Sequence, residues 1–106
     1  MRESSLGEQM LGWLFLKKKM KFKDVFVSTT DRYAIGIEET GLKFYLSIPV
    51  SNGVVDYEEY YRIDKSAFER FQRDPALAID FANRCRSRKM DHLLLVKPGR
   101  NRGVAS

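Results

Sequence analysis

Few side chains in this sequence have the type and spacing that catalysis needs. His92 is the only histidine and Cys85 the only cysteine, so a histidine pair or a cysteine-based metal cluster cannot form within one chain. No Gly-rich phosphate loop and no nucleophile motif is present. We therefore expect no enzyme, no catalytic residue, no metal, no cofactor and no small-molecule substrate. Cys85 is expected to be a small core residue.

The residues best suited to recognition form an acidic and aromatic run. Tyrosine offers contact area at a low cost in conformational entropy, and carboxylates steer a basic partner toward the surface. The run therefore predicts a protein-binding surface. Its candidate contacts are Asp56, Tyr57, Glu58, Glu59 and Tyr60.

Basic side chains offer an alternative function, a small nucleic-acid-binding module. Arg84 and Arg88 are four residues apart, so they share one face of an expected helix. Cations near a helix C-terminus also interact favourably with the helix dipole, which explains these two residues without a ligand. Interleaved aromatic residues, which single-strand binding would favour, are absent from this face. The alternative site comprises Lys17, Lys18, Lys19, Arg84 and Arg88.

The net charge of +5 is unevenly distributed along the 106 residues. Residues 1–23 contain six Lys/Arg and two Asp/Glu, and residues 65–106 contain ten and four. Residues 24–64 contain only three Lys/Arg against eight Asp/Glu. The basic chain thus has an acidic middle third, which favours a basic partner for that region.

The elements that position the acidic run begin with a β-hairpin. Strands over 42–50 and 54–63 alternate apolar and polar residues, and Asn52-Gly53 between them is typical of a type I′ turn. A two-residue turn pairs Leu46 with Glu59 and places one apolar face inward and one polar face in water. Glu59 is the exception on the apolar face. An Arg or Tyr neighbour, a bulge or a partner protein could satisfy its carboxylate.

Strands are also expected at 24–29, 33–38 and 92–96, from their β-branched and aromatic content. A short helix follows the hairpin, with Asp64 or a Ser66 and Glu69 capping box at its start. Asp74-Pro75 begins a second helix that extends to about Arg88. We predict an α+β fold: an antiparallel sheet of about five strands with a central hairpin (turn at Asn52-Gly53) and two helices packed on one face.

One domain over residues 1–106 is expected, with 1–9 frayed or a non-native extension. The apolar run over 11–16 is far shorter than the ~20 residues that cross a bilayer, and lysines follow it instead of preceding it as in an export signal. A single cysteine favours a reducing compartment. We expect a cytoplasmic protein with no membrane span. Residues 13–16, Trp-Leu-Phe-Leu, could instead dock on a second copy, so the oligomeric state stays open.

Four segments together resemble a known family. They are Asp24-Val-Phe-Val-Ser-Thr-Thr30, Lys43-Phe-Tyr-Leu-Ser-Ile-Pro-Val-Ser-Asn-Gly53, Val55-Asp-Tyr-Glu-Glu-Tyr-Tyr61 and Leu94-Leu-Val-Lys-Pro-Gly-Arg-Asn-Arg-Gly103. They resemble small bacterial immunity proteins of contact-dependent growth inhibition and related polymorphic toxin systems. The resemblance covers roughly residues 10–104 and is most distinctive in the hairpin.

The resemblance implies a cytoplasmic toxin inhibitor that acts by protein–protein interaction. Such a protein binds its cognate toxin C-terminal domain, often a nuclease, and blocks the active site or an adjoining surface without covalent chemistry. No contact residue is carried over from the family. The acidic run is a physically sensible match for a basic nuclease site, whereas the net charge of +5 departs from that simple picture.

Overall fold

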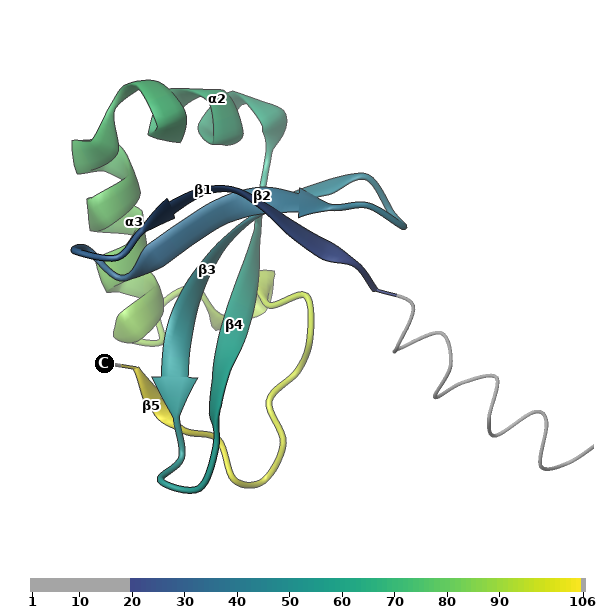
Figure 1. Cartoon of the computed structure of the whole chain (residues 1–106), viewed down its shortest axis with the longest axis vertical. Helices are drawn as coiled ribbons and strands as arrows, with labels where there is room; N and C mark the ends of the chain where they lie inside the picture. The colour runs from purple at the N-terminus through teal and green to yellow at the C-terminus, as the bar shows by residue number, and fades with distance from the viewer. Residues whose placement is uncertain (1–19, 106) are drawn as a thin grey trace, which may run out of the picture.

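The computed structural model describes residues 20–105 and confirms the α+β prediction. An antiparallel sheet of five strands carries two helices on one face (Figure 1). The elements are β1 Phe22–Ser28, β2 Tyr33–Glu38, β3 Lys43–Ser51, β4 Asp56–Ile63, α2 Lys65–Arg73, α3 Pro75–Arg86, the 3₁₀ helix η1 Asp91–Leu93 and β5 Val104–Ala105.

The strands follow the order β1-β2-β3-β4, and β5 pairs with the far end of β3. The pairing of β3 with β2 stops at Ser47, and its pairing with β5 begins at Val50. Pro49 lies between these two points, where β3 has no neighbour on that edge. Proline removes a ladder donor, so this gap explains how it is tolerated in a central strand.

The hairpin register differs from the predicted one. Ser51 pairs with Asp56 and Ile48 pairs with Glu59, which is a shift of two residues. The type I′ prediction was wrong because the connection is a four-residue loop, in which only Gly53 has a positive φ, of 88°. The Asn52 side chain accepts hydrogen bonds from the N–H groups of the last two loop residues, both at 2.9 Å. A shift of two leaves every side chain on its predicted face.

Both helices begin at aspartate caps. Asp64, and not the Ser66 box, caps α2 by accepting from the Ala67 N–H at 2.7 Å. Asp74 caps α3 with Pro75 at its first position, as predicted. The helix ends at Arg86, slightly before the predicted Arg88.

The main core lies between the helices and the sheet. It contains alternate residues of β2, β3 and β4 together with the inner faces of α2 and α3, which is the pattern expected when one sheet face is covered. Its buried members are Tyr33, Ile35, Leu46, Ile48, Val50, Tyr61, Ile63, Phe71, Ala78, Ala82 and Cys85.

The opposite face of the sheet is not the open polar face that the alternation predicted. Tyr45 on this face is 0% exposed. The β1–β2 ribbon lies across the β3–β4 ribbon (Figure 1), so that Phe22 of β1 stacks on Tyr60 of β4 with ring centroids 3.7 Å apart. A shift in register between Asp24 and Phe26 marks a bulge in β1. Bulges increase the local bend and twist of a strand, which helps the sheet to curl over itself.

Gly36 makes this close crossing possible. A Cβ at this position would lie 2.3 Å from the Tyr45 hydroxyl oxygen and 2.2 Å from the Lys23 carbonyl oxygen. The Tyr45 hydroxyl passes over the glycine and donates to Asp24 Oδ1 at 2.6 Å. The second, smaller core on the outer face therefore depends on the absence of a side chain in β2.

Replacing Gly36 by alanine should destabilise the protein by about 3 kcal/mol, because backbone and a buried ring must both move. Urea unfolding followed by circular dichroism measures the change. Gly99→Ala is the control, since a Cβ there meets nothing within 4 Å. Equal stabilities of the two variants would contradict the proposed role of Gly36.

Glu38 ties the start of β1 to the turn between β2 and β3. Its carboxylate is 2% exposed and accepts from the backbone N–H groups of Lys21, Thr40 and Gly41 at 2.9–3.0 Å, and from the Thr40 hydroxyl. Burial by itself would raise the pKa of Glu38. The hydrogen bonds outweigh burial and lower that pKa to about 2.

Stability should therefore fall with acid in a way that depends on Glu38. Between its ordinary pKa of 4.5 and about 2, the unfolded chain takes up a proton that the folded chain does not, so the free energy of unfolding decreases as the pH falls. Between pH 5 and pH 2 the wild type should lose about 2 kcal/mol more than Glu38→Gln. Urea titrations at each pH measure this, with Glu39→Gln as the matched exposed control. If the free energy of unfolding of Glu38→Gln fell with pH as steeply as that of the wild type, the proposed role of Glu38 would be contradicted.

The C-terminal segment follows a different path from the predicted one. The strand expected at 92–96 was wrong: η1 covers Asp91–Leu93, and only an isolated bridge from Leu94 to Tyr61 continues toward the sheet. The chain then runs along the free edge of β4 and around the hairpin end, where β5 joins β3 (Figure 1). Gly103 fits closely against Ser51, since a Cβ would lie 2.4 Å from its carbonyl.

Candidate functional site

The five predicted contact residues do not form one surface, because β4 alternates between two faces. Tyr57 and Glu59 point to the helix-covered side, together with Tyr61. Asp56, Glu58 and Tyr60 point to the outer side. Their partners in β3 follow the same alternation, with Val50 opposite Tyr57 and Pro49 opposite Glu58.

Glu59 is a structural residue inside the protein. It is 6% exposed, and Arg102 donates to both of its carboxylate oxygens, at 2.8 and 3.1 Å. The Tyr61 hydroxyl donates to it at 2.9 Å. Arg102 also binds both oxygens of Asp91, at 2.7 and 2.9 Å. Of the alternatives left open by the sequence, arginine and tyrosine neighbours satisfy this carboxylate, so it is not available to a partner.

Removing Arg102 should destabilise the folded protein, because the Glu59 carboxylate would stay buried without a cation beside it. Arg102→Met is expected to lower the free energy of unfolding by about 3–5 kcal/mol. The double variant Glu59→Gln/Arg102→Met should be more stable than Arg102→Met alone, since no unpaired charge remains. Chemical denaturation measures both, with Arg100→Met as the exposed control. A double variant that is less stable than the single one would count against this reading.

The two tyrosines of the run also have structural roles. The Tyr57 hydroxyl accepts from the Gly103 N–H at 2.7 Å and so holds the C-terminal segment. Tyr60 stacks on Phe22 and meets Tyr45 edge to face at 4.9 Å. Both rings are half-buried, so each has some exposed area in addition to its internal contacts.

Three exposed carboxylates remain on the outer side, and we call them the acidic face: Asp24, Asp56 and Glu58. Asp24 and Glu58 line one hollow of about 440 Å³, with Pro49 and Arg32. Partial desolvation, together with the nearby Asp24 charge, raises the pKa of Glu58. The Ser47 hydroxyl acts in the opposite direction and lowers this pKa, but it does not outweigh the other two effects. That hydroxyl makes no hydrogen bond of regular geometry with another described residue. Sequence reasoning missed Asp24, because only the curl of β1 brings it to β4.

Only Arg84 and Arg88 of the nucleic-acid alternative lie among the described residues, and each has a partner within the protein. Lys17, Lys18 and Lys19 lie outside the described residues, as do residues 13–16 of the proposed self-association. Arg84 pairs with Asp80 at 3.2 Å on the exposed side of α3. Arg88 donates to the Gly103 carbonyl at 3.1 Å and so helps to hold the C-terminal segment.

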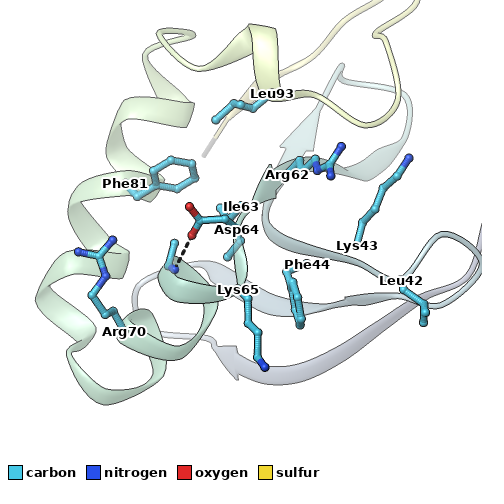
Figure 2. Close-up of a pocket in the computed structure, with 11 residues that line it drawn as sticks. Leu42, Lys43, Phe44, Arg62, Ile63, Asp64, Lys65, Arg70, Phe81 and Leu93 are labelled. Atoms are coloured by element: carbon cyan, nitrogen blue, oxygen red, sulfur yellow. Dashed lines mark hydrogen bonds between the residues drawn. The ribbon is translucent and has the colours of Figure 1, made fainter.

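A second feature was not predicted at all. We call it the basic hollow, a depression of about 570 Å³ where β3, β4 and α2 meet (Figure 2). Its wall includes the apolar side chains of Phe44, Ile63, Phe81 and Leu93. Its cations are Lys43, Arg62, Lys65 and Arg70.

The cations of the basic hollow have no anionic partner among residues 20–105. Asp64 is the single acidic residue that lines the hollow, and its carboxylate accepts from the backbone at the start of α2 (Figure 2). The four cations are spread over three elements, two of them within the acidic middle third. No local run in the sequence could therefore have shown that the four cations line one hollow.

Nothing in the described part of the chain assembles a reactive centre. Cys85 is buried, and burial raises the pKa of its thiol to about 12, so the nucleophilic thiolate is not populated near neutral pH. No group of three or more His, Cys, Asp or Glu residues within 20–105 is placed to hold a metal ion.

Comparison with protein-family models, curated proteins and solved structures gave no significant match. Within residues 20–105, no helix is both long and apolar enough to cross a membrane.

Proposed function

We propose that the protein is an immunity protein that binds a cognate toxin domain and blocks it through its acidic face. The observation that carries this proposal is that Asp24 and Glu58, from strands at opposite ends of the sheet order, line one hollow, with Asp56 on the same side of β4 as Glu58. In a chain of net charge +5, this local reversal of sign favours a basic partner.

The electrostatics of the acidic face suit rapid and specific association. Carboxylates facing a positive surface accelerate encounter and reject partners of like charge. Glu58 already bears part of its desolvation cost in the free protein, as its raised pKa indicates. A basic side chain from the partner would favour its charged form. The resemblance to toxin-immunity families supports a nuclease domain as that partner, since such active sites are basic.

The face is also held in place before binding. Asp24 accepts a hydrogen bond from the buried Tyr45 hydroxyl at 2.6 Å. Asp56 and Glu58 lie on β4, which is paired along its length with β3. A preorganised surface loses little conformational entropy when it binds. This rigidity supports inhibition by simple occlusion, without a change of fold.

The test uses the C-terminal domain of the large exported protein expected from the gene immediately upstream. The wild-type chain should bind that domain and suppress its toxicity. The Asp56→Lys/Glu58→Lys variant should raise the Kd at least about 100-fold, because the reversed charges repel a basic surface. Surface plasmon resonance measures the binding, and survival of cells that express the toxin measures protection.

Glu69→Lys provides the matched control, because Glu69 is an exposed carboxylate on α2, outside the acidic face. It should bind and protect like the wild type. The proposed function fails if no complex forms with the toxin domain. The proposed surface fails if the wild type binds and the double charge reversal leaves the Kd unchanged.

A further inference from the structure

The basic hollow has the composition of a recognition site that is separate from the acidic face. We propose that it docks an acidic segment of a partner protein, with one apolar side chain of that segment in the hollow and carboxylates on the surrounding cations. Arg62, near the end of β4, belongs to the basic hollow, and Asp56 and Glu58, at its start, belong to the acidic face. The two sites are therefore separated along β4.

The wall of the hollow is apolar and rigidly supported. Phe44 packs against Phe68 with ring centroids 4.5 Å apart, and Phe81 packs against Phe71 at 5.4 Å. Ile63 adds a buried aliphatic surface. Convergent aromatic and aliphatic groups with a few charged groups around them are typical of binding sites for small apolar moieties. A hollow of about 570 Å³ has room for a leucine or phenylalanine side chain.

The charges around this wall specify an anionic partner. Lys65 and Arg70 come from α2, and Lys43 and Arg62 come from the ends of the two hairpin strands (Figure 2). Four cations and one carboxylate, that of Asp64, line this depression, and no carboxylate within 20–105 forms an ion pair with the cations. An acidic segment would neutralise this excess of positive charge and add charge-assisted hydrogen bonds, which arginine makes in bidentate geometry.

The arrangement favours a peptide over a nucleic acid. Single-stranded nucleic acids are bound along a track of cations, with bases stacked on open aromatic faces. Here the cations surround a single depression. Phe44 and Phe81 each already pack against another phenylalanine of the core, which leaves less of each ring for a base.

The experiment is a titration of the ¹⁵N-labelled full chain with the capped peptide Glu-Glu-Leu-Phe-Glu-Glu, followed by amide chemical shifts. We expect saturable shifts at Lys43, Phe44 and Arg62, with a submillimolar Kd that rises with added salt. Arg70→Glu should weaken binding at least about fivefold. Arg73→Glu is the matched control, because both arginines lie in the last turn of α2 and are exposed, but only Arg70 lines the hollow.

Two further probes distinguish the apolar wall from general electrostatic attraction. The peptide Glu-Glu-Gly-Gly-Glu-Glu should bind at least about fivefold more weakly, because nothing enters the hollow. An eight-nucleotide uridine RNA should bind more weakly than the leucine-containing peptide. Equal binding of the glycine peptide, tighter binding of the RNA at the same residues, or no saturable shift would each overturn the proposal. Toxin binding is measured in a separate experiment. The peptide titration therefore tests the basic hollow even if the chain binds no toxin domain.

Discussion

The buried carboxylate of Glu59 is the constraint that the path of the chain must satisfy. A lone charge on the helix-covered face would cost several kcal/mol, and the only cation that reaches it in the described structure is Arg102, 43 positions later. Arg102 is itself held by Asp91 at the start of η1. The C-terminal segment must therefore return to the sheet, and this return brings β5 to β3 and closes the end of the hairpin.

The two proposed binding surfaces follow from how the remaining elements are arranged around that hairpin. The curl of β1 over β4 brings Asp24 beside Glu58, and the packing of α2 at the other end brings Lys65 and Arg70 toward Arg62. The β4 strand thus has carboxylates at its start and a cation near its end. The opposite charges stay separated because β1 and α2 pack against different ends of the hairpin.

Local patterns predicted the parts of the fold that depend on local physics. Alternation in the hairpin identified the correct faces, since a shift of two residues preserves side-chain parity, and Asp74-Pro75 marked the start of α3. The failures concern long-range geometry. The sequence left several partners open for Glu59 because Arg102 is distant, and it predicted a wet outer face because nothing local shows that β1 crosses it. No local pattern placed Lys43 and Arg62 in a common hollow with Lys65 and Arg70, for the same reason.

The outer face shows why that crossing matters for recognition. Asp24 belongs to the acidic face only because Tyr45 lies over Gly36 and donates to its carboxylate. Burial and that hydrogen bond both raise the pKa of Tyr45, so the hydroxyl keeps its proton and remains a donor throughout the physiological range. The charge geometry that a basic partner would meet is thus a product of the second core. A surface of this kind exists only in the fully folded chain, which ties recognition of the partner to the integrity of the whole sheet.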